Sequence, residues 1–230
     1  MNTLFLTLFN PVKAFGKLKT IDKFSTMSLI VLLVLMLLNL ILLIPVTEKI
    51  MLITFSSMSL PENQMDTMIQ FAHKMRYIQM AGSVILYVIM FLFYAFLFSL
   101  FVRIADNKLD YKKALQLIIC SYFVVVLGDL VNTAFIYLRG LDSITGMYDI
   151  SLTGINLLTS AEQIGATRYV MLSCITPFQL WFVVLLSIGL KIFTDMKQVK
   201  AVIISVLFWL ITILIPVLSV YFSQSATNKL

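Results

Sequence analysis

The stretch FSTMSLIVLLVLMLLNLILLIPVT (residues 24–47) contains no charged side chain. Four later stretches resemble it in length and composition, and only the third of the five is interrupted, by Asp129. A helix rises 1.5 Å per residue, so about 20 apolar residues cross the roughly 30 Å hydrocarbon layer of a membrane. The sequence therefore predicts five membrane spans, at about residues 25–46, 80–102, 114–138, 169–191 and 201–222.

The composition supports the same fold class. Hydrophobic residues make up 60% of the chain and charged residues 12%, too few charges to cover a soluble core of this size. A membrane β-barrel would show short alternating segments instead of unbroken apolar runs. We expect an all-α integral membrane protein, in which a cytoplasmic arm with a short interfacial helix (residues 1–24) precedes one five-span domain (residues 25–230).

Lysine and arginine are distributed unevenly between the two sides of these spans. Of the 17 basic residues, 11 lie in the N-terminal arm and in the loops after the second and fourth spans. Because cytoplasmic loops retain positive charge, the N-terminus is predicted inside and the C-terminus outside, in a multi-pass protein of the cytoplasmic (inner) membrane. The same charge would attract anionic lipid headgroups, and no basic–aromatic interleaving indicates nucleic-acid binding.

Two segments between the spans carry helical patterns. After Asn10, the residues Pro11, Ala14, Phe15 and Leu18 share one face, which predicts a short amphipathic helix at the cytoplasmic interface; a simple lysine-rich anchor for the first span is the alternative. The first outer segment, residues 48–81, predicts a helix opening at residues 61–62.

Methionines define one face of that outer helix. Met65, Met68, Ile69 and Met75 fall on one side of it. We interpret this face as resting on the bundle or on lipid. Contact with a partner protein and Cu(I) binding by thioethers are alternatives. The second outer segment, residues 140–167, is compatible with a loop, a re-entrant element or a docking strand.

Residues suited to catalysis or metal binding are scarce. The single histidine, His73, excludes a histidine-based metal site or catalytic triad. Cys120 and Cys174 lie near opposite ends of their spans, too far apart in depth for a disulfide. The sequence has no glycine-rich phosphate loop, nucleophile elbow or zinc-protease motif. We therefore expect no catalytic residues, no metal and no cofactor.

Asp129 is the one ionisable residue inside a predicted span, and such residues are functional candidates because a carboxylate in hydrocarbon is costly. Tyr122, Asn132 and Thr133 share its helix face, and Asn39 lies at a comparable depth in the first span. We interpret this intramembrane polar cluster as hydrogen bonding between helices, with an ion or proton relay as the alternative.

One proline is expected to change the path of a span. Pro177 follows Thr176 well inside the fourth predicted span, where the missing N–H and the ring should kink the helix. A kink is compatible with gating, but it is more often a matter of packing alone.

Three stretches resemble a known family. NPVKAF (residues 10–15), DYKKALQLIICSY (residues 110–122) and LWFVVLLSIGLKIFTDMKQVKAVIISVLFWLI (residues 180–211) resemble, in order, the beginning of the Yip domain, its entry to the third span, and its last two spans. The longest of these includes Trp181 and Gly189. The resemblance also extends to the layout of the whole chain, with the N-terminus inside and the C-terminus outside.

The resemblance implies a non-catalytic protein that acts through other integral membrane proteins. Eukaryotic members of the family work with small GTPases in vesicle traffic, whereas the size and compact loops of this chain resemble bacterial members. One bacterial kind is an accessory to an ABC-type exporter similar to the macrolide exporters and protects against a secreted toxic peptide. The resemblance thus favours an accessory subunit with an exporter permease as partner. A stand-alone small transporter or channel and a lipid or trafficking scaffold are the alternatives.

The charge distribution yields a test of orientation. Single cysteines at positions 108 and 229, in a chain whose own two cysteines are replaced, should react differently with a membrane-impermeant reagent in intact cells. We expect labelling at 229 and none at 108, because the lysine-rich loop stays inside. Labelling at 108 without labelling at 229 would reverse the orientation.

Overall fold

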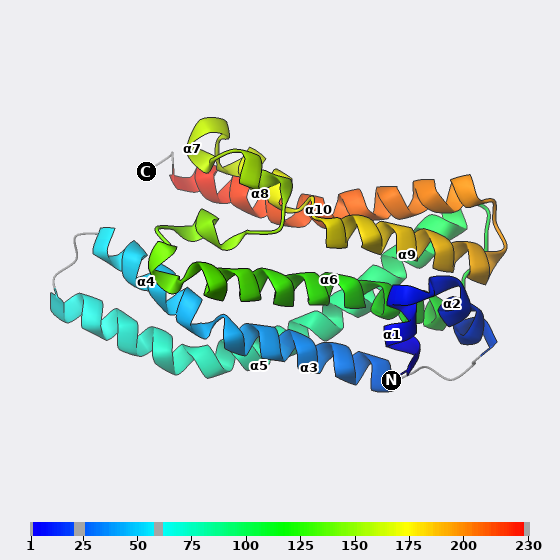
Figure 1. The fold of residues 1–230 in the computed structure, drawn as a ribbon, viewed down its shortest axis with the longest axis horizontal. Helices are drawn as coiled ribbons and strands as arrows, with labels where there is room; N and C mark the ends of the chain where they lie inside the picture. Colours follow the sequence, from blue (N-terminus) through cyan, green and yellow to red (C-terminus); the bar gives the residue numbers. More distant parts are fainter. Residues whose placement is uncertain (1, 21–25, 58–61, 228–230) are drawn as a thin grey trace.

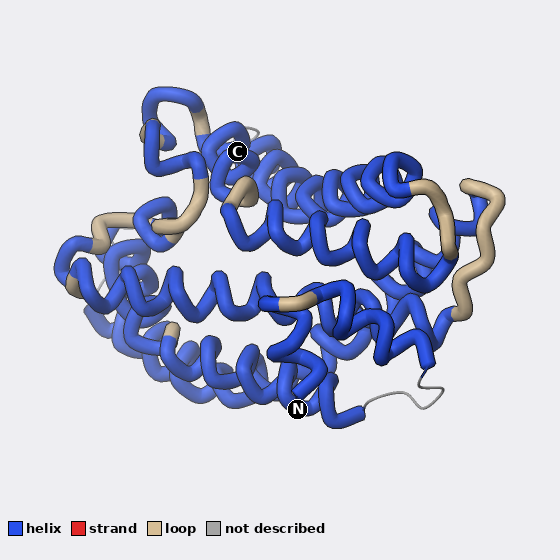
Figure 2. The backbone as a smooth tube through the Cα atoms, turned by 45° about the vertical axis from the view of Figure 1, so that its right-hand side comes forward, coloured by secondary structure: helices blue, strands red, loops and turns tan. Residues whose placement is uncertain are grey.

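The computed structural model describes residues 2–20, 26–57 and 62–227, and every regular element in these ranges is helical. Figures 1 and 2 show a long bundle with an irregular segment at one end. The all-α fold predicted from the sequence is confirmed. The main helices are α1 (Asn2–Phe9), α2 (Pro11–Thr20), α3 (Thr26–Leu42), α4 (Ile44–Ser57), α5 (Glu62–Ile104), α6 (Tyr111–Arg139), α9 (Pro177–Thr194) and α10 (Gln198–Thr227).

The spans agree in number with the prediction when α3 and α4 count as one. The helices α5, α6, α9 and α10 are each long and apolar enough to cross a membrane, and α3 and α4 are so together, with a 43° bend between them. Pro45, in the first turn of α4, causes the bend, because it cannot donate to the carbonyl of Ile41. The first span is therefore broken where a continuous helix was expected.

Helix α6 lies at the centre of the bundle and contacts α3, α5 and α9. Two glycines let α6 and α9 approach closely. A Cβ atom at Gly128 would lie 2.5 Å from the Phe178 ring, and one at Gly189 would lie 2.1 Å from the Leu117 side chain. Close van der Waals contact of this kind is what holds helices together in lipid, where the hydrophobic effect between them is absent.

The short helix α2 packs into the bundle. Ala14, Phe15 and Leu18, the apolar face predicted to lie on the membrane surface, are buried, and α2 contacts α9. At the end of α2, the Lys19 ammonium lies 2.9 Å from the Asp195 carboxylate in the turn between α9 and α10. The face expected at the interface is thus part of the core.

Helix α5 is one continuous element of 43 residues. At 1.5 Å per residue it extends about 64 Å, roughly twice the hydrocarbon thickness. The predicted outer helix is therefore the N-terminal half of α5 and continues directly into the second span, instead of being a separate helix resting on the bundle. Arg76 in this half donates to the Glu48 carboxylate of α4.

A folded cap connects α6 to α9. It consists of the 3-10 turns η1 (Leu141–Ser143), η2 (Met147–Ile150) and η3 (Ile155–Leu158), followed by α7 (Ala161–Ile164) and α8 (Ala166–Ser173). We call residues 141–173 the cap segment. It lies at the opposite end of the bundle from α2 and the turn between α9 and α10 (Figure 1).

The three basic segments counted for the topology meet at the end of the bundle that holds α2. The N-terminal helices, the α5–α6 loop and the α9–α10 turn lie together there (Figure 1). Besides the ion pair of Lys19, the Lys200 ammonium donates to the carbonyl of Ala105 across two of these segments. The fold thus gathers on one side the charges that predict a cytoplasmic face.

Replacing Gly128 with alanine tests the α6–α9 contact. The added methyl group would meet the Phe178 ring, and overpacking of this kind destabilises by about 1–3 kcal/mol. Gly82→Ala in α5 is the matched control, because open space surrounds that position and alanine favours a helix by about 1 kcal/mol over glycine. Thermal unfolding in detergent should show a lower midpoint for Gly128→Ala only; equal midpoints would contradict the packing described.

Candidate functional site: a polar cavity beside α6

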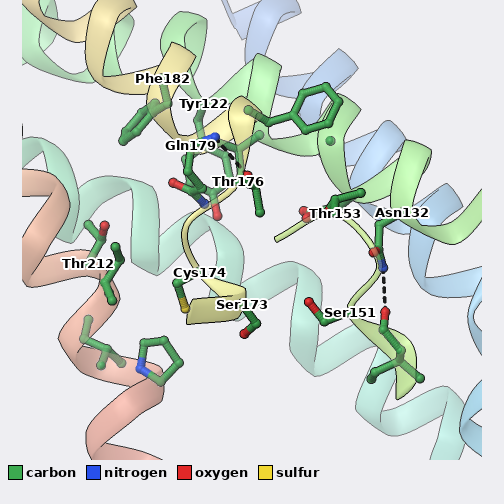
Figure 3. Close-up of a pocket in the computed structure, with 18 of the residues that line it drawn as sticks. Tyr122, Asn132, Ser151, Thr153, Ser173, Cys174, Thr176, Gln179, Phe182 and Thr212 are labelled. Atoms are coloured by element: carbon green, nitrogen blue, oxygen red, sulfur yellow. Dashed lines mark hydrogen bonds between the residues drawn. The ribbon is translucent and has the colours of Figure 1, made fainter. Parts of the chain in front are cut away.

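A cavity of about 420 Å³ lies between α6, the cap segment, the start of α9 and α10 (Figure 3). Its wall on α6 is a single helix face at three- and four-residue spacing, formed by Tyr122, Val125, Asp129 and Asn132. Hydroxyl and amide groups from the other elements complete the lining. The cavity is therefore polar although it lies inside an apolar bundle.

Asp129 carries the charge of the cavity. Its side chain is exposed in the cavity, and no described residue donates a hydrogen bond to it or forms an ion pair with it. Tyr122, two turns earlier, packs edge-on against the rings of Phe91 and Phe182, with centroids 5.2 and 5.8 Å away. Of these rings, Tyr122 and Phe182 line the cavity, together with Tyr94, and they form its inner end, on the side away from the cap.

Two prolines shape the facing walls. Pro177 is the first residue of α9, where the Thr176 hydroxyl caps the helix by accepting the backbone N–H of Gln179 at 3.1 Å. The predicted kink within a continuous span is therefore wrong: α8 ends at Ser173, α9 begins at Pro177, and α9 alone is long enough to be the span. In α10, Pro216 has no N–H for the carbonyl of Thr212, which leaves another acceptor at the wall.

Asn132 fastens the cap segment to α6. Its amide nitrogen donates to the carbonyl of Ile150 at 2.8 Å, and its oxygen accepts the N–H of Leu152 at 2.7 Å. Deeper in the cap, the buried Asn156 donates to the carbonyl of Ser151 and to the hydroxyl of Tyr169. The cap is thus a hydrogen-bonded unit and not a strand.

Asp149 fixes a turn of the cap and is not among the residues that line the cavity. Its carboxylate accepts the backbone N–H and hydroxyl of Thr145, at 2.8 and 2.7 Å, and the N–H of Gly146 at 3.0 Å. Partial burial acts to raise the pKa of Asp149, but these hydrogen bonds, together with the charge of Arg139, outweigh it and hold the pKa below its ordinary value. The turn therefore carries a negative charge at neutral pH.

The five residues of the predicted polar cluster do not form one group. The Thr133 hydroxyl donates to the Asn39 side-chain oxygen at 2.7 Å, which joins α6 to α3. Asn132 lines the cavity beside Tyr122 and Asp129, but its amide is hydrogen-bonded to the cap. Hydrogen bonding between helices thus describes Thr133 and Asn39, but Asp129 takes no part in it.

The predicted partner-contact face is divided in a similar way. Met68 is exposed, Ile69 and Met75 are half-buried, and the side chain of Met65 lies outside the described part of the structure. The apolar residues that α5 exposes most nearby are Phe71, Tyr77 and Ile78, which the prediction omitted. The most exposed apolar face of this part of α5 is therefore displaced around the helix from the face that the sequence predicted.

Several lining residues also escaped the prediction. Gln179 was detectable as a lone amide near the start of an apolar span, directly after the helix-capping pair Thr176 and Pro177. The contribution of Thr212 depends on a proline one turn later in α10. Asn156 gives no local signal, because its partners belong to an irregular segment.

The chemistry of this site is that of binding. Within the described ranges no group of three His, Cys, Asp or Glu residues is placed to hold a metal ion. Cys120 and Cys174 are free thiols, and only Cys174 reaches the cavity. A single carboxylate surrounded by hydroxyls, amides and aromatic rings can hold a cationic group in place.

Comparison with known proteins identifies the family. The model of the Yip1 domain matches residues 5–220, nearly the whole chain. The chain belongs to the Yip1 domain family. Searches of curated proteins and of solved structures return no match.

Membership in the Yip1 family agrees with the apolar helices and makes the chain a multi-pass membrane protein. The family is one of membrane trafficking and accessory proteins and is not known for enzymes. Every part of the cavity, including the cap segment, lies inside the matched region.

Asn132→Leu and Asp129→Leu should differ in their effect on the cap. Leucine at 132 leaves the carbonyl of Ile150 and the N–H of Leu152 without their partner, at a cost of about 1–3 kcal/mol. Leucine at 129 breaks no hydrogen bond with a described residue, so the cap should stay in place. Limited proteolysis of residues 141–173, together with thermal unfolding in detergent, measures both effects; equal sensitivity of the two variants would contradict this account.

Proposed function

We propose that this Yip1 family protein is a non-catalytic accessory or assembly subunit of the cytoplasmic membrane. In this proposal it belongs to the bacterial branch of the family and supports an ABC-type exporter that protects the cell from a toxic peptide. Its partners are integral membrane proteins, foremost the exporter permease, and anionic lipid headgroups contact its basic end. The resemblance of the spans and the compact loops to bacterial members supports the choice of partner.

A continuous apolar surface on α5 is the observation that carries this proposal. Its residues recur at alternating three- and four-residue spacing, with Gly82 at the position between Ile78 and Ile85, and all the apolar side chains but the half-buried Met75 are exposed. We call this surface the α5 stripe; it comprises Met68, Phe71, Met75, Ile78, Ile85, Ile89, Leu92 and Phe96. Alternating spacing is what one helix presents to a second helix packed along it.

The length of the stripe favours a protein partner over lipid alone. Contact with lipid accounts for exposed apolar side chains only along the part of a helix that crosses the hydrocarbon layer, which is about 20 residues long. The stripe continues over residues 68–96, beyond that length and past the charged residues Lys74 and Arg76. Gly82 lies within the stripe with open space around it, which would allow close approach of another helix.

The distribution of polar residues argues against a channel through the bundle. The cavity ends at the rings of Tyr94, Tyr122 and Phe182. Between these rings and the basic end, the core is filled by buried apolar side chains, among them Phe98, Phe208, Leu117, Leu186 and Leu190. A transporter needs a polar path to both sides, so the packing supports an accessory role.

Photo-crosslinking combined with co-purification tests the proposal. A photoreactive amino acid at position 71 should capture the exporter permease in native membranes, and purification should bring down the permease with its ATPase. The same amino acid at position 158 is the matched control, because Leu158 is also exposed and apolar but lies on the cap. Crosslinks from position 71 to lipid alone would contradict a helix partner on the stripe.

A substitution pair measures the strength of that contact. The double variant Phe71→Ser, Ile78→Ser should reduce recovery of the permease at least about tenfold. The reason is that burying each of these apolar side chains against a partner contributes roughly 1.5–3 kcal/mol of binding free energy. Membrane abundance should stay unchanged, because both side chains are exposed in this chain. Leu158→Ser should leave recovery unchanged. Unaltered recovery of the permease with the double variant would contradict a contact at the α5 stripe.

A further inference from the structure

The unpaired carboxylate in the cavity calls for a counter-charge. Asp129 is the one acidic or basic residue lining the cavity in the part of the chain that the structure describes. A carboxylate at this depth is costly unless it is protonated, wetted or paired. Among the described residues, the cavity offers it no lysine, arginine or histidine, so a pairing cation would come from outside the described part of the chain.

The size of the cavity indicates the kind of cation. A volume of about 420 Å³ falls within the range of small-molecule sites, whereas one water occupies about 30 Å³ of liquid. A bare metal ion would leave most of this space unfilled. One carboxylate is also a poor ligand set for a divalent metal, which takes several charged or histidine ligands.

The lining suits an organic ammonium group. An ammonium has three N–H donors and no acceptor, so it needs acceptors around it. The Asp129 carboxylate, the side-chain oxygen of Gln179 and the carbonyl of Thr212 that Pro216 leaves free can provide them. The rings of Tyr122 and Phe182 lie at the inner end, where aromatic faces attract a cation and accept an apolar body.

We propose that this cavity binds a small organic cation of the primary-ammonium class, with Asp129 as its counter-ion and the aromatic end of the cavity around its apolar part. The inference concerns binding and is independent of the exporter partnership. Anions are disfavoured, because the one acidic or basic residue among the described lining residues is acidic.

Cys174 supplies a reporter within the site. It lines the cavity and is partly exposed, whereas Cys120, the other thiol, is buried in α6. In purified full-length Cys120→Ala protein, the rate of Cys174 alkylation by N-ethylmaleimide can be measured with benzylammonium as the probe. Benzyl alcohol is the matched ligand, with the same shape and no charge.

The proposal predicts protection that depends on charge. Benzylammonium at about ten times its dissociation constant should slow alkylation roughly tenfold, because occupied cavities do not react. Benzyl alcohol should protect much less. Asp129→Asn should abolish protection by benzylammonium, and Asp129→Glu should retain part of it. Asp142→Asn, an exposed cap acid outside the cavity, should behave as the parent protein does.

Four outcomes would overturn the inference. Equal protection by benzyl alcohol would make the cavity an apolar site. Undiminished protection in Asp129→Asn would show that the Asp129 carboxylate does not contribute to binding. Protection by sodium or potassium chloride equal to that by the amine would indicate an inorganic cation. Protection by the copurified permease but not by benzylammonium would make the occupant a protein side chain. Size-exclusion profiles of each variant distinguish lost binding from lost folding.

Discussion

The close approach of α6 and α9 governs the arrangement of the other elements. In lipid, helices gain little from the hydrophobic effect and associate through contact, so small residues at crossing points decide which helices become neighbours. Gly128 admits the Phe178 ring at one end of this pair, and Gly189 admits Leu117 at the other. With α9 held in this position, α10 and α2 pack on its free sides and α3 and α5 on those of α6.

The same contact determines where the bundle is filled and where it stays open. Toward the basic end, Phe15 and Leu117 close the space beside Gly189. Toward the cap, α9 begins only at Pro177, and α8 packs on α10 without closing the space beside α6. The cavity is what remains, and its walls are polar because helix breaks expose backbone groups that capping residues such as Thr176 must satisfy.

The two proposed surfaces face different partners. The α5 stripe is apolar, runs the length of a helix and is formed by residues adjacent in sequence, as expected for a helix partner in the membrane. The cavity is concave and charged, and residues far apart in sequence form it, as expected for a small ligand.

The sequence by itself determined the number of spans, the helical class and the family, because span length and unbroken apolar runs are local properties of the chain. It also identified Asp129, Asn132 and Thr133 as exceptional residues. Only the tertiary structure decided that Thr133 pairs with Asn39, that Asn132 holds the cap and that Asp129 stands alone in a cavity. Residues on one helix face differ by tens of degrees in direction, and the neighbouring helix or cap, not the spacing, determines what each one meets. For the same reason the bend at Pro45 and the start of α9 at Pro177 became clear only once the packing was known.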